Sequence, residues 1–271
     1  MIENSKETDE KINALKRAVN ASATALAPPE IWCLHGAVGA ASDWRELGKK
    51  LAEQGISTRA VDLWRFLEAG SMTMPEFGKR LNAEAAGEVF RGQKRILMGY
   101  SMGGRLALHA LLAGGPWDGV IIISANPGLR DPGESSARRA SDAAWAEAAL
   151  TLPWDSFIEK WNAQPLLGGP MRDEREDKKL IHRRREIARS FVDWSVGNQA
   201  PLWDRLHEIQ QPVLWISGEN DSKYTAIAHD VFHLCQKMTV TSAPGCGHRV
   251  PWENDVWLTA QISDWIEDFS I

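Results

Sequence analysis

A serine enclosed by glycines stands between a short apolar run and a helical pattern, and this junction constrains the fold more than any other feature of the sequence. The residues are Gly99-Tyr100-Ser101-Met102-Gly103, a G-x-S-x-G motif. Glycines are needed two positions to either side because the chain turns so sharply from strand to helix that larger side chains would clash. The turn is therefore expected to lift the Ser101 hydroxyl above the end of a sheet.

Six short apolar runs predict buried strands, and the first four alternate with helical patterns. This alternation predicts an α/β protein with a mostly parallel sheet covered by helices on both faces. The expected strands are 31–34, 58–63, 95–99, 120–124, 213–217 and 238–241, and the expected helices are 44–54, 74–90, 105–112 and 252–269.

Residues 30–271 are predicted to form one domain, because a single core can grow to this length in mixed α/β folds. Within it, residues 127–208 carry helical patterns without a convincing strand. An insertion at this point of an α/β sheet lies over the carboxyl edge, where ligands bind, so it is predicted to be a helical cap. Residues 1–29 are predicted to be an N-terminal extension, with a helix over 5–22. The helices expected in the cap are 141–150, 154–161 and 172–191.

Composition excludes several classes of function. A net charge of -5 provides no basic face for nucleic acid or anionic lipid. The chain begins without the apolar core of a secretory signal and has no apolar stretch long enough to span a bilayer, so we expect a soluble, cytoplasmic protein without membrane partners. Its three cysteines lack metal-ligand spacing, and no dinucleotide fingerprint is present, so no metal or organic cofactor is expected.

The basic run 182–185 is interpreted as a solvated helical face, with a phosphate or carboxylate site as the alternative.

Two later loops carry the partners that a reactive serine needs. A serine hydroxyl becomes reactive when a histidine accepts its proton and an acid orients that histidine. Asp221 follows the expected strand 213–217, and His248 follows the expected strand 238–241. This order of serine, acid and histidine is that of the α/β-hydrolase fold, which the sequence therefore predicts. Ser101, Asp221 and His248 are the predicted catalytic residues, with Glu219 as the alternative acid.

A glycine-rich turn after the first strand, Leu34-His35-Gly36-Ala37-Val38-Gly39, predicts an oxyanion hole. In this fold such a turn donates one backbone N–H, here that of Ala37, and the residue after the nucleophile, Met102, donates the other. His35 is expected to order the turn and is also kept as a candidate substrate contact.

Several segments of the chain resemble the 2-succinyl-6-hydroxy-2,4-cyclohexadiene-1-carboxylate synthase family, α/β-hydrolase-fold enzymes of menaquinone biosynthesis. The cap segments are the most specific, because generic esterases share the serine motif but not the cap. The segments are LHGAVGAASDW from Leu34, GYSMGGRLALHALL from Gly99, NPGLRDPGESSARRASDAAWA from Asn126, FIEKWNAQPL from Phe157, GENDSKYTAIA from Gly218 and PGCGHRVPWEN from Pro244. Three stretches depart from the family pattern: residues 62–66, residues 190–194 and the N-terminal extension, which stands in place of the family's usual first hairpin.

The resemblance implies a lyase that eliminates pyruvate from 2-succinyl-5-enolpyruvyl-6-hydroxy-3-cyclohexene-1-carboxylate. The reaction begins with loss of a proton next to the succinyl carbonyl, and Ser101 is the implied base. Three substrate carboxylates call for guanidinium donors. The residues that match family substrate contacts are Arg105, Arg138, Arg189, Tyr100 and Trp161.

The triad by itself does not decide the reaction. A serine hydrolase of an ester, thioester or carbon-carbon bond would use the same three residues and the same oxyanion hole. A ligand-binding protein that retains the triad without catalysis is a third hypothesis. Incorporation of solvent oxygen into the product separates the first two.

Overall fold

The computed structural model describes residues 28–88, 92–168 and 174–270. A single sheet of six strands has the order β2-β1-β3-β4-β5-β6, and every neighbouring pair is parallel. All six predicted strands are confirmed. Their bounds are β1 Glu30–Leu34, β2 Ser57–Val61, β3 Arg95–Tyr100, β4 Gly119–Ile123, β5 Val213–Gly218 and β6 Met238–Ala243.

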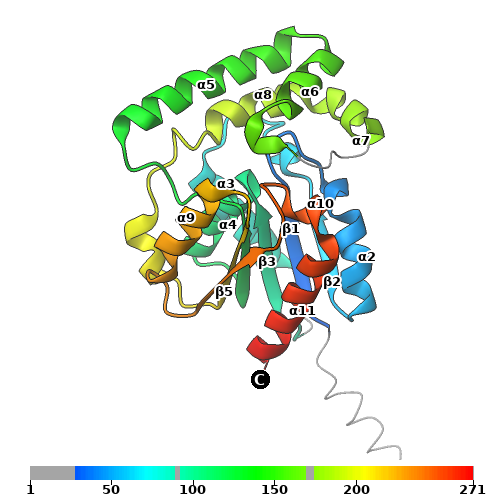
Figure 1. Cartoon of the computed structure of the whole chain (residues 1–271), viewed down its shortest axis with the longest axis vertical. Helices are drawn as coiled ribbons and strands as arrows, with labels where there is room; N and C mark the ends of the chain where they lie inside the picture. The colour runs from blue at the N-terminus through cyan, green and yellow to red at the C-terminus, as the bar shows by residue number, and fades with distance from the viewer. Residues whose placement is uncertain (1–27, 89–91, 169–173, 271) are drawn as a thin grey trace, which may run out of the picture.

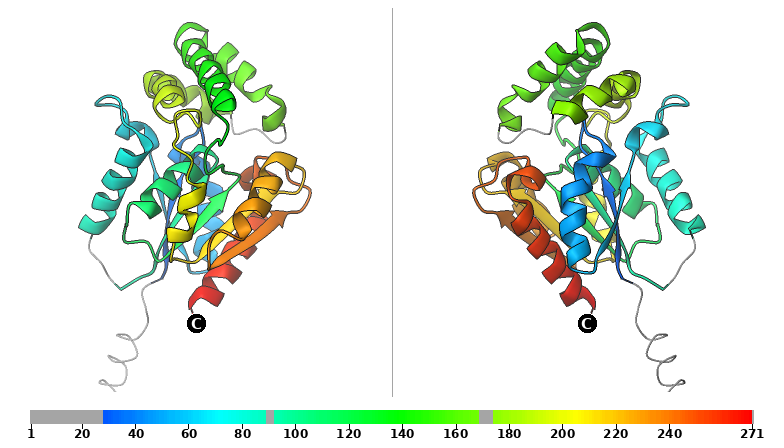
Figure 2. Two further views of the ribbon diagram at one scale, coloured as in Figure 1. Left: turned by 90° about the vertical axis from the view of Figure 1, so that its left-hand side faces the viewer. Right: turned by 90° about the vertical axis from the view of Figure 1, so that its right-hand side faces the viewer.

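The sheet is buried because helices cover both of its faces, as predicted (Figures 1 and 2). Every residue of β3, β4 and β5 is buried, whereas the edge strands β2 and β6 are partly exposed. Apolar residues of α3, α4 and α9 pack on one face, and those of α2, α10 and α11 on the other. These helices are α2 Arg45–Glu53, α3 Met74–Gly87, α4 Met102–Leu112, α9 Ser222–Phe232, α10 Val250–Glu253 and α11 Asp255–Ser270.

Local capping explains where the elements differ from the predicted bounds. The strand expected to reach residue 63 ends at Val61 because the Asp62 carboxylate accepts a hydrogen bond from the Trp64 N–H at 3.1 Å and starts the 3-10 helix η2, Leu63–Phe66. A second 3-10 helix, η1 (Ala41–Trp44), precedes α2. Helix α4 begins directly after Ser101, earlier than expected.

The segment between β4 and β5 is helical and lies beyond the carboxyl ends of the strands, where the cap was expected (Figure 1). Helices α5 and α8 pack closely against each other. The predicted long helix over 172–191 is divided, and its described part begins at Glu174. The elements are α5 Pro132–Thr151, α6 Trp154–Asn162, η3 Pro165–Leu167, α7 Glu174–Lys179, η4 Leu180–Arg183, α8 Arg184–Asp193 and η5 Trp203–Glu208.

The cap is tied to the core by Arg183, a member of the basic run 182–185. Its guanidinium binds the carboxylates of Asp62, at 2.7 Å, and Glu68. These acids hold the Arg183 side chain against the loop after β2, so this member of the run is neither a freely solvated cation nor a ligand contact.

The N-terminal helix expected over 5–22 lies outside the described residues. Among the helices that are described, none combines the length and the apolar character that crossing a bilayer requires.

Candidate active site

The Ser101 turn is a tight, strained junction. Ser101 has φ 52° and ψ -110°, a region that residues other than glycine rarely adopt, and its N–H donates to the Ile123 carbonyl at 2.8 Å. A Cβ at Gly103 would lie 2.2 Å from the Leu34 carbonyl oxygen, so β1 approaches the start of α4 as closely as a glycine permits. This packing holds the Ser101 side chain at the carboxyl end of β3.

Ser101, His248 and Asp221 form a continuous hydrogen-bonded chain. His248 Nε2 lies 3.1 Å from Ser101 Oγ, and His248 Nδ1 lies 2.7 Å from Asp221 Oδ2. Because the carboxylate can only accept, Nδ1 carries the proton and leaves Nε2 to accept one from the serine. Asp221 also accepts the Tyr224 N–H at 3.2 Å as the N-cap of α9. Glu219 is exposed and binds the Gly245 N–H, so Asp221 is the acid that reaches the histidine.

The loop that carries His248 is held by both its neighbours. Glu253 accepts hydrogen bonds from the Gly247 N–H at 2.5 Å and the Arg249 N–H at 2.9 Å, one with each carboxylate oxygen. The Asn220 N–H donates to the Cys246 carbonyl at 2.8 Å, which joins the acid loop to the histidine loop. These bonds fix the backbone on either side of His248.

Two aromatic rings enclose the His248 imidazole. The ring centroids of Tyr100 and Tyr224 lie 5.5 Å and 4.5 Å from it, and His248 is only 2% exposed. Tyr100 is itself buried, and burial raises the pKa of its phenol. The imidazole is therefore shielded from solvent by neutral rings on both sides.

A cavity of about 660 Å³ opens above these residues, between the sheet edge and the cap. Ala37, Ser101, Met102 and His248 line it, so both predicted oxyanion donors border the same space as the serine. Met102 is the first residue of α4, where a backbone N–H has no partner within the helix. The cap and the core contribute further lining residues, among them Asn126, Arg130, Glu134, Arg138, Asp142, Trp145, Trp161, Gln164, Leu167, Trp203, Lys223 and Tyr224.

Arg105 is a cation buried beneath this cavity, one helical turn after Ser101. It lines the cavity and is 8% exposed. Its Nη1 donates to the Trp194 carbonyl at 2.8 Å and to Gln199 Oε1 at 3.3 Å, both neutral acceptors. Burial, and then the charge of Arg138, lowers the pKa of Arg105 to about 10. No carboxylate of the described residues forms an ion pair with it.

Arg138, Trp161 and Tyr100, also predicted from the sequence, line the cavity too. Arg138 lies on α5, and its Nε donates to Asp142 Oδ1 at 2.8 Å. Asp142 is buried and accepts the Ser195 hydroxyl with its other oxygen, so Arg138 neutralises an internal acid while its own side chain is 42% exposed. The structure thus brings two of the three predicted arginines to the cavity.

Two predicted substrate contacts are placed elsewhere and are corrected here. The Arg189 guanidinium donates to the Leu67 carbonyl in the loop after η2 and does not line the cavity. His35 is fully buried beneath the glycine-rich turn. Its Nδ1 binds the Gly36 carbonyl at 2.9 Å and its Nε2 accepts the Leu63 N–H at 3.3 Å. These bonds make His35 an ordering residue of the turn, the first of its two expected roles.

Tyr224, Lys223 and Arg130 line the cavity but were missed by the sequence analysis. Tyr224 and Lys223 stand in the first turn of α9, directly after Asp221, and this proximity to the acid was a usable signal. Arg130 lies over the Trp203 ring, 4.0 Å from its centroid, a contact that no sequence pattern indicated. Within the described residues, no cluster of three or more His, Cys, Asp or Glu side chains could hold a metal ion.

Comparison with known proteins agrees with the observed fold. The model of the Alpha/beta hydrolase family matches residues 33–260. The 2-succinyl-6-hydroxy-2,4-cyclohexadiene-1-carboxylate synthase of Serratia proteamaculans (strain 568) is 27% identical over 242 residues, covering 87% of this chain and 92% of that protein. Among solved structures, MenH from S. aureus has a TM-score of 0.78 at 21% identity, over 90% of this chain and 95% of that one. An esterase from Exiguobacterium antarcticum has a TM-score of 0.70 at 16% identity, over 89% and 92%. At these identities the two structures show the fold alone.

Proposed function

The chain belongs to the Alpha/beta hydrolase family, and within it we propose a lyase of the 2-succinyl-6-hydroxy-2,4-cyclohexadiene-1-carboxylate synthase type. The substrate is 2-succinyl-5-enolpyruvyl-6-hydroxy-3-cyclohexene-1-carboxylate, and the reaction eliminates its enolpyruvyl group as pyruvate. The similarity to the synthase of Serratia proteamaculans over most of both chains supports this choice.

The observation that carries the proposal is the buried cation Arg105. A guanidinium out of water and without an ion-pair partner among the described residues is costly unless an anion reaches it. Because Arg105 lines the cavity next to Ser101, that anion is a carboxylate of the substrate. A hydrolase of neutral esters does not require such a charge at this position.

The triad removes the proton that starts the elimination. Ser101 Oγ transfers its proton to His248 Nε2 as it takes one from the ring carbon next to the succinyl carbonyl. The imidazolium is stabilised by Asp221, and the negative charge that develops on the carbonyl oxygen is stabilised by the N–H groups of Ala37 and Met102.

The electron pair then moves through the ring and breaks the bond between the ring carbon and the enolpyruvyl oxygen. Enolpyruvate leaves and gains a proton on carbon to give pyruvate, so no water is consumed. His248, which received the proton, returns to its neutral form by releasing it. The cavity holds the ring and the leaving group together between the cap and the sheet edge.

Incubation of the purified protein with this substrate tests the proposal directly. We expect equimolar pyruvate and the cyclohexadiene product, with no oxygen from isotopically labelled water in either the ring or the succinyl group. Pyruvate absent from the mixture at all enzyme concentrations would reject the lyase.

A serine hydrolase is the second candidate, because the Ser101–His248–Asp221 geometry suits acyl transfer equally well. In that case Ser101 attacks a carbonyl carbon and forms an acyl-enzyme, which water then cleaves. Labelled solvent oxygen in the released acid, together with an acyl group on Ser101, distinguishes this reaction from the elimination.

A further inference from the structure

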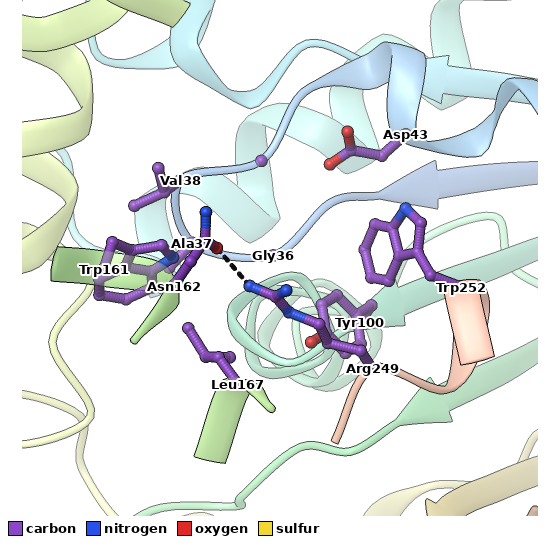
Figure 3. Close-up of a pocket in the computed structure, with 11 residues that line it drawn as sticks. Gly36, Ala37, Val38, Asp43, Tyr100, Trp161, Asn162, Leu167, Arg249 and Trp252 are labelled. Carbon is purple, nitrogen blue, oxygen red and sulfur yellow. Dashed lines mark hydrogen bonds between the residues drawn. The ribbon is translucent and has the colours of Figure 1, made fainter. Parts of the chain in front are cut away.

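Among the described residues, four Lys and Arg side chains line the main cavity, and Arg105 is the one of them that is buried. The exposed ones are Arg130, Arg138 and Lys223. A smaller cavity of about 40 Å³ adjoins the main one, and Arg249 in its lining binds Asn162 of the cap (Figure 3). Of the two cavities, the main one, at about 660 Å³, has room for the ring of the proposed substrate. Arg105 is therefore the buried cation beside the space that this substrate would occupy.

The hydrogen bonds from the Arg105 guanidinium to described residues all involve one nitrogen, Nη1. It donates to the Trp194 carbonyl at 2.8 Å and to Gln199 Oε1 at 3.3 Å, and the Met74 sulfur lies 3.7 Å away. The Trp194 carbonyl stands at the C-terminus of α8, where helix carbonyls carry a partial negative charge. The three N–H groups on Nε and Nη2 bind none of the residues that the structure describes, so they remain as donors for a group that enters the cavity.

Gln199 is a buried side chain, 7% exposed, in the turn through which the chain returns from the cap to β5. Ser195 anchors this turn to α5. Its hydroxyl donates to Asp142 Oδ2 at 2.7 Å and accepts the Gly197 N–H at 3.0 Å. The backbone that carries Gln199 is therefore fixed relative to the cap, and its side chain reaches across to Arg105 on α4.

The side-chain partner of Arg105 is a neutral amide. Gln199 Nε2 is buried without a hydrogen-bond partner among the described residues, so the amide is not required by its own hydrogen bonds. A carboxylate in its place would pair the buried guanidinium, which otherwise has no ion-pair partner in the described part of the chain. The acid Asp142 acts on Arg105 through space, but its oxygens bind Arg138 and Ser195. The exposed arginine thus has the acid, and the buried one has the amide.

We propose that Gln199 is a positioning residue, which directs the Arg105 guanidinium into the cavity and, because it is neutral, leaves the charge of that group for a substrate carboxylate. This inference rests on the proposed function. A carboxylate at position 199 would form an internal ion pair with Arg105 and compete with the substrate. Stability and substrate binding should then change in opposite directions in Gln199→Glu, whereas the loss of a purely structural residue lowers both.

The test measures binding of the proposed tricarboxylate substrate by titration calorimetry in the Ser101→Ala background, where turnover does not disturb the equilibrium. Gln199→Glu is expected to raise the dissociation constant roughly 10- to 150-fold, the effect of one charge-assisted hydrogen bond, and to raise the urea midpoint. An unchanged dissociation constant overturns the proposal. A higher dissociation constant with a lower urea midpoint also overturns it, because the new side chain would then only disrupt the packing.

Gln199→Met separates the charge from the hydrogen bond, because methionine has a similar length but is apolar. It is expected to lower the urea midpoint and to raise the dissociation constant less than Gln199→Glu does, since the Arg105 charge stays uncompensated. Equal dissociation constants for the two variants would show that the neutrality of Gln199 does not matter and would contradict the proposal.

Asn198→Asp is the matched control, because it adds the same charge at the neighbouring residue, which is exposed. It is expected to leave the dissociation constant unchanged, and a rise as large as that in Gln199→Glu would assign the effect to added charge in general. In the Arg105→Ala background, Gln199→Glu is expected to weaken binding no further. A full additional loss there would show that Gln199 does not act through Arg105.

The same proteins separate this inference from the proposed function. Wild-type protein that releases no pyruvate from the substrate contradicts the proposed function, whatever the dissociation constants are. Pyruvate release by wild type together with unchanged affinity in Gln199→Glu contradicts this inference alone. A Ser101→Ala protein that does not bind the tricarboxylate contradicts both.

Discussion

Glu253 binds the backbone on both sides of His248, accepting the Gly247 N–H at 2.5 Å and the Arg249 N–H at 2.9 Å with its two carboxylate oxygens. The residue that accepts the serine proton is thereby positioned by an acid that belongs to the following helix, α10. A carboxylate suits this place because all of its lone pairs accept, so neither amide competes with a donor.

Glu253→Gln is expected to lower kcat with little change in KM. One end of the new amide group is a donor, so one of the two N–H groups beside His248 loses its partner, and the loss of stability is about 1–3 kcal/mol. Kinetics and urea unfolding measure the two effects. Glu219→Gln is the matched control, because Glu219 binds the Gly245 N–H in the same loop but is exposed. Equal kcat values for the two variants would show that the pair of hydrogen bonds accepted by Glu253 does not position His248.

Arg105→Ala is expected to lower kcat/KM on the tricarboxylate substrate about 10- to 150-fold, the equivalent of about 1.5–3 kcal/mol for a charge-assisted hydrogen bond. Arg189→Ala is the control and is expected to stay near wild type, because the Arg189 guanidinium binds Leu67 away from the cavity. Steady-state pyruvate release measures both. Activity that survives the loss of Arg105 would leave the fold assignment intact but remove the main support for an anionic substrate.

Ser101→Ala is expected to lower kcat about 10²- to 10⁴-fold, the contribution of a general base, while the arginines still bind substrate. A base forms no acyl-enzyme, so mass spectrometry of quenched wild-type enzyme should find Ser101 unmodified during turnover. An acyl adduct that forms at the turnover rate would refute proton abstraction. Reaction of wild type with a fluorophosphonate checks the histidine-activated serine independently, and a serine that does not react while ligand still binds favours a non-catalytic binding protein.

His109 is expected to make the fold sensitive to acid. It is buried on α4, its Nε2 has no hydrogen-bond partner among the residues that the structure describes, and burial lowers its pKa to about 4 from 6.5. The unfolded chain therefore binds a proton between pH 6.5 and pH 4 that the folded chain resists, and stability falls as the pH drops through this window. The loss amounts to about 3 kcal/mol for a shift of this size.

Urea midpoints at pH 7.5 and pH 4.5 measure this dependence. His109→Leu is expected to reduce the difference between the two values, because the proton-binding group is gone. His229→Gln, at a side chain that is 82% exposed, is expected to retain the wild-type difference. An unchanged difference in His109→Leu would assign the acid sensitivity to other groups.

The strands and the Ser101 turn could be predicted because their causes are local. An apolar run such as Val120–Ile123 cannot avoid burial, and the glycines around Ser101 are required by the turn itself. The order of Ser101, Asp221 and His248 along the chain then followed from the topology of the sheet. The choice between Asp221 and Glu219 stayed open, since both acids stand in one loop, two residues apart.

The cap shows where local reasoning ends. Helical spacing correctly placed Arg105 one turn after Ser101, because both residues belong to one continuous turn and helix. Arg189 has comparable signals in the sequence, yet its helix, α8, packs so that the guanidinium meets Leu67 of the core. A periodic pattern predicts which residues share one face of a helix. Which surface that face contacts depends on how the cap packs on the sheet.

By itself, then, the sequence determined the sheet, the Ser101 turn and the reacting serine, because covalent neighbours and hydrophobic periodicity impose them. Tertiary structure decided which charges surround that serine. Arg249 became a cavity residue only because Asn162 of the cap and Tyr100 of the core come to lie on either side of it. Such contacts depend on the packing of whole elements against one another, which residue spacing alone does not encode.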